Sequence, residues 1–596
     1  MSKTHSFHIP VMGIAYTIDT PLKVAQYGVD SVISLVDDIL LEKLRKMYSE
    51  KFELNFKEIS NKTADFRAKR ITAYLNLIQD LTVKKFNSFK ESTSEITKYF
   101  DMLPDTASIK KEFIALTEKH FDLDEIKTWL NANLNLGSID VNIMTKVDKA
   151  NYLKGEQLPT EYNDAHAALR GFANSKLKSS LILSAGMSPR LYSYLENFED
   201  FFPNESGELK KKIVLKVSDY RSAFIQGKFL AKKGIWVSEY RIESGLNCGG
   251  HAFATDGFLM GPILEEFKNN RDYLIDTVHE ILIEALASKG KAVPKQKLAL
   301  KVTAQGGVGT SEEHNTLLDY YKVDKVGWGS PFLLVPEATT VDDATRKQLV
   351  AAKEKDLYLS GISPLGVPFN SLRGNTKDVA KQALIDKGRP GSSCPKEFLK
   401  STTEFTNKAI CTASRQYQKL KLEELNTLNL PKDSYDKSFF KITEKACICT
   451  GLGTAALVEN DIDTRVEGSG ISVCPGPNLA YFSKTVALED MIGHIYGKKE
   501  TLSSNNRPNL FIKELGLYLD CLKNAIQDSK EYVTKKEQKY LEKFAKNLVA
   551  GIAYYQGFFE NNFKAKKTQI ISDLTLCKEE LTVLQESIEN LKLVLV

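Results

Sequence analysis

Short runs of β-branched and other apolar residues alternate with longer amphipathic stretches up to about residue 340. Most of these runs end in Gly, Ser or Asp, and a pattern with helical spacing follows. Alternating strands and helices form a parallel sheet, and eight of them favour a (β/α)8 barrel over an open doubly wound sheet, which needs fewer strands. The eight expected strands are His8–Met12, Ser31–Leu35, Val141–Thr145, Leu181–Ala185, Ile213–Val217, Trp236–Tyr240, Leu300–Ala304 and Lys325–Trp328.

Residues 38–135 interrupt this alternation after the second strand. They are rich in Lys, Glu, Phe and Leu, and apolar positions recur at helical spacing, as in Phe66–Ile78. We therefore expect a helical insertion, which could lie on the active face of the barrel or at its opposite end.

The pattern changes again after the barrel. Residues 346–500 are rich in Gly and Pro, which indicates a loop-rich module that something other than a large core stabilises. Residues 501–596 return to helical patterns. The expected division is a barrel formed by residues 1–37 and 136–345, the insertion 38–135, the module 346–500 and the C-terminal helices 501–596.

The last helix carries apolar residues at alternating spacings of three and four, which is a heptad seam. This helix either packs on its own domain or pairs with a second copy in a homodimer. The seam consists of Leu574, Cys577, Leu581, Leu584, Ile588, Leu591 and Leu595.

Composition narrows the class of protein. The 596 residues include 81 basic and 76 acidic ones, a net charge of +5, which argues against nucleic acid as the main partner. No apolar run approaches the ~18 residues of a membrane span, and the N-terminus lacks the apolar stretch of a signal peptide. We expect a cytoplasmic enzyme that does not bind membranes.

Glycines follow both the seventh and the eighth expected strand. They are Gly306, Gly307 and Gly309 in one segment and Gly329, followed by Ser330, in the other. Barrels often bind phosphate with the loops after these two strands, because glycine lets the backbone approach the phosphate closely. Two tight turns are the alternative, but the matched positions favour phosphate.

Five motifs resemble, in the same order, those of the nitronate monooxygenase (2-nitropropane dioxygenase-like) family of FMN-dependent barrels. They also resemble the enoyl reductases of polyunsaturated fatty acid and polyketide synthases. The resemblance covers residues 8–340 without the insertion. The motifs are Ile9-Pro10-Val11-Met12-Gly13, Val141-Asn142-Ile143, Cys248-Gly249-Gly250-His251, Ala304-Gln305-Gly306-Gly307-Val308, and Trp328-Gly329-Ser330-Pro331-Phe332 with Glu337-Ala338.

The resemblance implies an oxidoreductase that binds FMN. It places His251 over the flavin as a proton donor or acceptor, and Lys216 near the flavin as a positive charge, which would stabilise the reduced ring. A core histidine is the alternative for His251. The implied cofactor-binding residues are Met12, Gly13, Asn142, Lys216, Gly250, Gly306, Gly307, Gly329 and Ser330.

Two departures from the family bear on the reaction. The monooxygenases usually carry an acidic residue and Ala where this chain has Asn247 and Cys248, so Cys248 is either a catalytic thiol or a small filler. The segment 307–310 is closer to the enoyl reductases. The implied activities are therefore nitronate oxidation, or reduction of a small or acyl-type substrate with NADPH or a ferredoxin-type donor. A non-catalytic scaffold is the third alternative.

Five of the eight cysteines fall between residues 394 and 474, and two of them precede proline. Thiolates and Cys-Pro pairs occur at iron–sulfur sites. A [4Fe–4S] cluster could relay electrons to the flavin; a zinc site or buried free cysteines are the alternatives. The candidate ligands are Cys394, Cys411, Cys449 and Cys474, with Cys447 as a substitute.

Two weaker signals lie in the same module. Residues 451–456 match Gly-x-Gly-x-x-Ala after a strand-like run, but no acidic residue follows at the spacing of a nucleotide site. Residues 363–370 are rigid and follow the barrel, so they either close over the flavin or simply form a turn.

Overall fold

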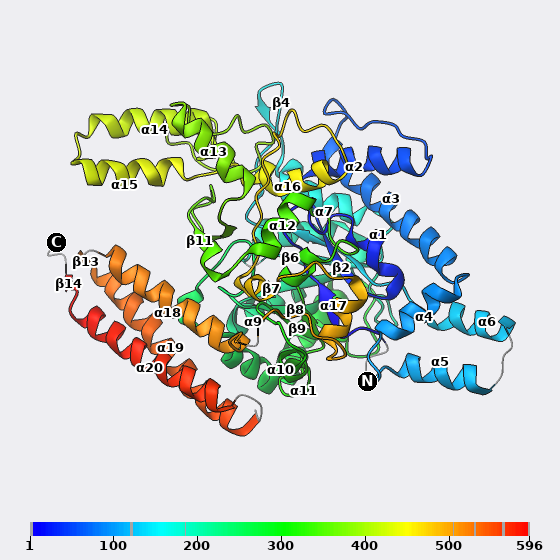
Figure 1. Cartoon of the computed structure of the whole chain (residues 1–596). Helices are drawn as coiled ribbons and strands as arrows, with labels where there is room; N and C mark the ends of the chain where they lie inside the picture. The colour runs from blue at the N-terminus through cyan, green and yellow to red at the C-terminus, as the bar shows by residue number, and fades with distance from the viewer. Residues whose placement is uncertain are drawn as a thin grey trace.

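The computed structural model describes residues 4–119, 123–184, 186–504, 506–529, 532–562 and 567–593. Eight parallel strands close into a barrel in the order β1-β10-β9-β8-β7-β6-β3-β2, which confirms the expected (β/α)8 fold (Figure 1). The strands are β1 (Phe7–Ile9), β2 (Asp30–Ser34), β3 (Ile139–Ile143), β6 (Ser180–Leu183), β7 (Lys212–Val217), β8 (Val237–Glu243), β9 (Lys301–Gln305) and β10 (Lys325–Gly327).

Two strands end three residues away from the expected position, whereas the other ends differ by two residues or fewer. β1 ends at Ile9 rather than Met12, where Pro10 follows and has no N–H to donate to a neighbouring strand. β8 continues to Glu243, three residues beyond the expected end at Tyr240. Ala185, the expected end of the fourth strand, lies outside the described residues.

Helices connect the strands around the barrel. Side-chain caps fix where several of them begin: the Asp219 carboxylate accepts a hydrogen bond from the Ser222 N–H, and the Thr310 hydroxyl accepts one from the Glu313 N–H. These helices are α1 (Thr20–Val24), α7 (Asp164–Ala173), α8 (Pro189–Tyr194), α9 (Tyr220–Ala231), α10 (Met260–Ser288), α11 (Ser311–Asp319) and α12 (Asp343–Ala351).

The insertion after β2 is helical, as expected. Its longest helix, α3, packs against α2 and α7, and buries Ile71, Tyr74, Leu75 and Ile78 on one face. The insertion extends to one side of the barrel in Figure 1. Its helices are α2 (Asp38–Lys51), α3 (Phe66–Phe89), α4 (Thr93–Met102), α5 (Ser108–Lys119) and α6 (Leu123–Asn133).

The segment after the barrel shares the core of the barrel, because one hydrophobic cluster joins residues of both. A buried ion pair between Lys396 and Asp37 also connects the segment to the end of β2. Its elements are the antiparallel pair β11 (Leu357–Ser360) and β12 (Phe369–Leu372), and the helices α13 (Thr376–Asp386), α14 (Arg415–Thr427), α15 (Lys432–Thr443), α16 (Ile448–Glu459) and α17 (Leu488–Ile495).

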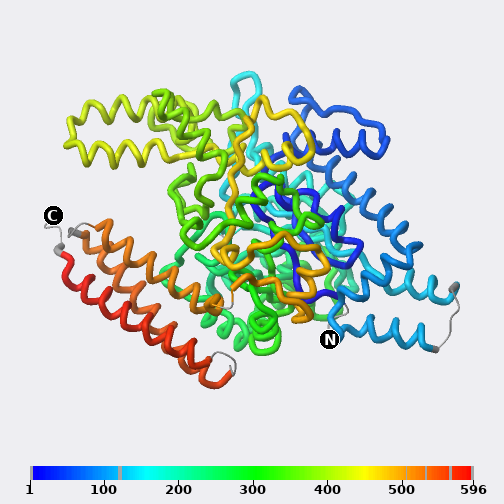
Figure 2. Tube along the Cα trace, viewed as in Figure 1, coloured from blue at the N-terminus to red at the C-terminus, as the bar shows by residue number. Residues whose placement is uncertain are grey.

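Three long helices form the C-terminal part: α18 (Leu510–Asp528), α19 (Lys535–Asn562) and α20 (Lys567–Glu589). They lie side by side at one corner of the molecule (Figures 1 and 2). Leu574, Leu581 and Ile588 of the heptad seam are buried, and α20 packs on α18 and α19. The seam is therefore used within this chain. Leu595 lies outside the described residues.

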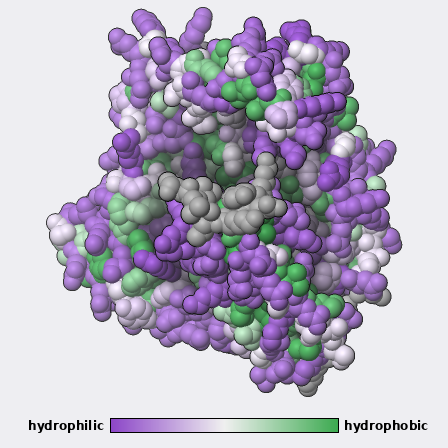
Figure 3. Space-filling view, turned by 90° about the vertical axis from the view of Figure 1, so that its left-hand side faces the viewer, coloured by the Kyte–Doolittle hydropathy of each residue, from purple (hydrophilic) through white to green (hydrophobic). Residues whose placement is uncertain are grey.

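Four two-residue strands form two further pairs. β4 (Tyr152–Leu153) pairs with β5 (Glu156–Gln157), and β13 (Tyr532–Val533) pairs with β14 (Lys592–Leu593). Polar residues cover most of the face in Figure 3, and hydrophobic ones are scattered among them. Among the described helices, none has the length and apolarity that crossing a membrane requires.

Candidate active site

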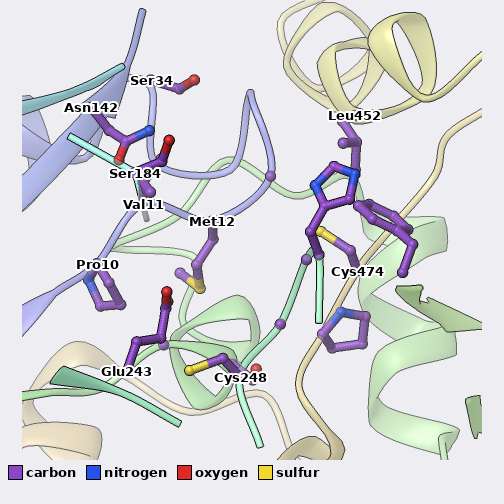
Figure 4. Close-up of a pocket in the computed structure, with 18 of the residues that line it drawn as sticks. Pro10, Val11, Met12, Ser34, Asn142, Ser184, Glu243, Cys248, Leu452 and Cys474 are labelled. Carbon is purple, nitrogen blue, oxygen red and sulfur yellow. The ribbon is translucent and has the colours of Figure 1, made fainter. Parts of the chain in front are cut away.

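A cavity of about 480 Å³ opens at the carboxyl ends of the barrel strands. This is the end where barrels carry their active sites. Figure 4 shows Ser34, Asn142 and Ser184 on one side of it and Glu243 and Cys248 on another. Each strand contributes at or just beyond its end, through Pro10, Ser34, Asn142, Ser184, Lys216, Glu243, Gln305 and Gly327.

The cavity brings together every residue that the sequence predicted for the flavin and substrate sites. These residues come from distant parts of the chain and meet only because the strands are parallel and the barrel is closed. They are Met12, Gly13, Asn142, Lys216, Cys248, Gly250, His251, Gly306, Gly307, Gly329 and Ser330. No described residue of the helical insertion lines the cavity, although Arg67 of α3 donates a hydrogen bond to the carbonyl of the lining residue Val36 at 2.8 Å.

Asn142 on β3 has a buried polar atom that a ligand could satisfy. Its side chain lines the cavity and is 4% exposed, yet its Oδ1 accepts no hydrogen bond within the described part of the chain. A buried polar atom without a partner costs about 1–3 kcal/mol. A ligand that donates a hydrogen bond to Oδ1, as the ring of a flavin can, would remove this cost.

The two glycine segments suit a phosphate. Gly307 has a φ of +77°, and a Cβ there would lie 1.8 Å from Asn247 Nδ2, so only glycine fits. A Cβ at Gly329 would make an ordinary van der Waals contact with Pro10 Cγ at 3.5 Å, so no steric clash requires glycine there, although Gly329 lines the cavity. The Ser330 hydroxyl accepts a hydrogen bond from the Gly476 N–H at 2.8 Å and keeps its own hydrogen to donate. The residues present fit FMN.

Lys216 does not stand alone in the wall. Its Nζ lies 3.1 Å from Oε2 of Glu243, and Gln305 Nε2 donates to the other carboxylate oxygen at 2.7 Å. Burial opposes ionisation of Glu243, but Lys216 and Gln305 outweigh it and hold the pKa of the carboxyl below its usual range. Glu243 was not among the predicted site residues, because the expected strand ended at Tyr240, three residues before the end of β8.

Cys248 belongs to the same group. Its Sγ donates to the Gln305 carbonyl at 3.6 Å. Burial, and then the nearby charge of Glu243, raise the pKa of this thiol well above its usual value. Cys248 is therefore a protonated thiol at neutral pH, which fits the filler better than the nucleophile.

His251 faces the cavity from the loop after β8. Its Nε2 lies 2.7 Å from the Ser363 hydroxyl, and Phe369 packs edge-on against the ring. Burial and the positive charges of Lys216 and Lys146 lower the pKa of His251 to about 4. The imidazole is neutral at physiological pH, so it can accept a proton or share one with Ser363.

The segment after the barrel closes the cavity. The Asn370 N–H donates to the Gly250 carbonyl at 2.8 Å, so the segment 363–370 contacts the Gly-Gly-His loop at the cavity. That it closes over a flavin stays a prediction. The closing residues are mostly apolar and include Leu365, Val367, Phe369, Leu399, Ile448 and Leu452. This apolar cover was not predicted from the sequence.

The described residues do not form the predicted iron–sulfur or zinc site. No group of three or more His, Cys, Asp or Glu side chains within them could hold a metal ion. Cys449 and Cys474 line the cavity. Cys394 and Cys411 are hydrogen-bonded to each other, which lowers the pKa of Cys394. Burial, and then the nearby Cys447 and Cys394, raise the pKa of Cys449. Cys447 is a buried free thiol.

The Gly-x-Gly segment at residues 451–456 is not a nucleotide loop. It lies inside α16, where the Gly451 N–H donates to the Cys447 carbonyl. The sequence also argued against a nucleotide site here, because no acidic residue follows this segment at the required spacing. Leu452 of this helix instead contributes to the apolar cover of the cavity.

No protein-family model and no curated protein matches the chain. Three solved structures are similar to it. The enoyl reductase domain of MlnA from Bacillus amyloliquefaciens is 17% identical, with 66% of this chain and 87% of that chain covered and a TM-score of 0.35. FabK from Thermotoga maritima is 14% identical, with 63% of this chain and 80% of that chain covered and a TM-score of 0.30. Nitroalkane oxidase from Streptomyces ansochromogenes is 9% identical, with 83% of this chain and 94% of that chain covered and a TM-score of 0.35.

These similarities are too low to carry an argument about function, which therefore rests on the residues of this chain. The barrel topology and the position of the five motifs around one cavity are properties of the chain itself. By its fold and its motifs, this chain is similar to the nitronate monooxygenase-like barrels and their enoyl reductase relatives.

Proposed function

We propose that this protein is an FMN-dependent oxidoreductase that acts on an apolar, acyl-type substrate. One observation carries the proposal: Asn142 Oδ1 is buried in the cavity wall, no described residue donates a hydrogen bond to it, and both glycine segments line the same cavity. An unpaired acceptor beside a phosphate-type loop fits a ligand that has an N–H-bearing ring at one end and a phosphate at the other.

The residues that would hold FMN are those predicted from the resemblance. The backbone of Met12 and Gly13 and the Asn142 amide would hold the ring, and the segments around Gly307 and Ser330 would hold the phosphate. When bound, FMN supplies a hydride acceptor and donor. The paired Lys216 and Glu243 add little net charge at the wall.

On the substrate side, the protein supplies a neutral base and an apolar cover. The Ser363 hydroxyl lies 2.7 Å from His251 Nε2 and orients the ring for proton transfer. Leu365, Val367 and Leu452 exclude water around it, which suits an acyl chain better than a small, strongly solvated anion. NADPH or a ferredoxin-type protein would supply the electrons.

Nitronate oxidation is the second candidate, because His251 stands where the monooxygenases carry their histidine. Asn247 counts against it. In this chain its amide donates to the Leu510 carbonyl at 3.1 Å, so this position binds the C-terminal segment rather than acting as an acid.

The test starts with the apoprotein and FMN. Titration followed by flavin fluorescence should show saturable binding, which Asn142→Leu weakens. The loaded protein is then mixed under anaerobic conditions with NADPH, with reduced ferredoxin or with propane-2-nitronate. Bleaching by either electron donor supports the reductase, and bleaching by the nitronate supports the second candidate. A chain that folds but does not bind FMN overturns both.

A further inference from the structure

Arg507 lies between the C-terminal segment and the glycine loop that follows β9. It is 8% exposed, and all the nitrogens of its guanidinium donate hydrogen bonds. Nε donates to Asn478 Oδ1 and Nη1 donates to Glu313 Oε1, both at 2.7 Å, while Nη2 donates to the Gly307 carbonyl. A buried arginine held on three sides fixes whatever it contacts.

Asn478 extends this contact to the next peptide of the loop. Its Nδ2 donates to the Val308 carbonyl at 2.7 Å. Two successive carbonyls of the loop are therefore held by side chains that lie far along the chain. The Asn478–Arg507 hydrogen bond joins these two side chains into one unit.

The direction of the carbonyls determines the direction of the N–H groups. In a trans peptide, the C=O of one residue and the N–H of the next point in opposite directions. Because Arg507 holds the Gly307 carbonyl, the Val308 N–H points away from Arg507. In the described part of the chain, no group accepts a hydrogen bond from the Val308 N–H. Gly307 and Val308 both line the cavity.

The same unit sets the start of α11. Glu313 Oε2 accepts from the Gly309 N–H at 2.9 Å, and its Oε1 accepts from the Leu510 N–H at 2.7 Å. A Cβ at Gly309 would lie 2.6 Å from Arg507 Nε, so glycine permits this close approach. Glu313 neutralises the guanidinium, and Arg507 therefore acts by position rather than by charge.

We propose that Arg507 is a positioning residue for the phosphate end of the flavin. It would hold the glycine loop in the conformation that presents the free N–H of Val308 to the phosphate. The inference rests on the proposed function, and it adds that the C-terminal segment of the chain, outside the barrel, determines how tightly the phosphate binds.

The experiment compares FMN with riboflavin, which has the same ring but no phosphate. Both are titrated into the full-length apoprotein, into Arg507→Gln and into the control Arg346→Gln. Arg346 is also a buried arginine that donates to a backbone carbonyl, that of Val341, but it does not line the cavity. Urea unfolding of each variant establishes that it is folded.

Arg507→Gln should weaken FMN by about tenfold or more, since an oriented hydrogen bond is lost, and should leave riboflavin nearly unchanged. The ratio of the two affinities therefore falls, whereas Arg346→Gln keeps it. Arg507→Lys retains one donor and should give an intermediate ratio; it also replaces Arg507→Gln if that variant does not fold.

An equal loss for FMN and riboflavin would overturn the inference, because it would mean that Arg507 only supports the fold. So would an unchanged ratio in a folded variant. If the unmodified protein binds neither ligand, the proposed function itself fails. The two failures are thus distinguishable.

Discussion

Lys216 and Glu243 form an ion pair across the neighbouring strands β7 and β8, with Nζ 3.1 Å from Oε2. The pair stands in the wall of the cavity next to the Cys248 thiol. Because the carboxylate offsets the ammonium, this part of the wall carries little net charge. The negative charge of Glu243 still lies close to the Cys248 thiol and disfavours its ionisation.

Replacing Glu243 should therefore activate Cys248. In Glu243→Gln the negative neighbour is gone and Lys216 is unpaired, so the pKa of Cys248 falls. Each unit of that fall gives about ten times more thiolate at a pH below the pKa. The rate of alkylation of Cys248 by iodoacetamide, followed by mass spectrometry, should rise accordingly. Lys216→Gln is the matched control and should slow the reaction; acceleration in both variants would contradict the electrostatic account.

Asn142→Leu should separate stability from ligand binding. It removes a buried amide oxygen that has no partner in the described chain, so the free energy of unfolding of the apoprotein should rise by about 1 kcal/mol. FMN binding should weaken at the same time. Thr82→Val removes another buried, unpartnered oxygen, far from the cavity, and should raise stability without changing the affinity for FMN. A loss of stability in Asn142→Leu would count against a ligand-directed role.

The lowered pKa of His251 predicts that the free energy of unfolding decreases at acid pH. Its folded value is about 4 and its ordinary value is 6.5, so the unfolded chain binds more protons between these limits. The folded state is therefore destabilised as the pH falls from 6.5 towards 4, by about 2 kcal/mol between pH 7 and pH 5. Urea unfolding at both pH values should show that His251→Asn is less sensitive to acid than the unmodified protein; equal sensitivity would mean that the folded pKa is not lowered.

Glu514 on α18 should behave in the opposite way. It is buried where α18 meets the barrel, accepts hydrogen bonds from the Ser244 hydroxyl and the Met260 N–H, and burial raises its pKa to about 7. The folded state holds this proton more tightly than the unfolded state, so the contribution is complete below pH 4.5 and is lost as the pH rises to 7.

Glu514→Gln keeps a neutral side chain of the same shape at every pH. Its unfolding free energy should exceed that of the unmodified protein by about 3 kcal/mol at pH 8 and nearly match it at pH 4. Urea unfolding at the two pH values measures this difference. A constant offset at both values would show that the carboxyl does not titrate in this range.

The fold and the grouping of the candidate site residues around one cavity were predictable because their signals are local. Each strand is a short apolar run, and Gly306 and Gly307 after β9 have positive φ angles that favour glycine. Glu243 was missed for a local reason too, since polar residues within β8 hid the true end of that strand. Arg507 and Asn478 could not be predicted, because nothing in the residues around them indicates that they meet a loop some 170–200 positions earlier.

The cysteines show the limit of spacing as a guide. Five thiols within one stretch of sequence suggest a common ligand, but the chain folds so that Cys449 and Cys474 face the cavity and Cys394 contacts Cys411. Which thiols meet depends on the path of α16 and its flanking loops around the barrel, and that path leaves no pattern in the sequence.

The buried ion pair of Asp37 and Lys396 constrains which substitutions this protein tolerates during evolution. Their side chains are 0% and 1% exposed, and they lie 359 positions apart in the chain. Loss of Lys396 would leave the buried Asp37 carboxylate without this cation, and loss of Asp37 would leave the Lys396 ammonium with the more distant Glu467, at 3.9 Å, whereas replacement of both by apolar residues is closer to neutral. The two positions should therefore vary together among descendants of this sequence, and a recombinant that inherits them from different parents should fold poorly.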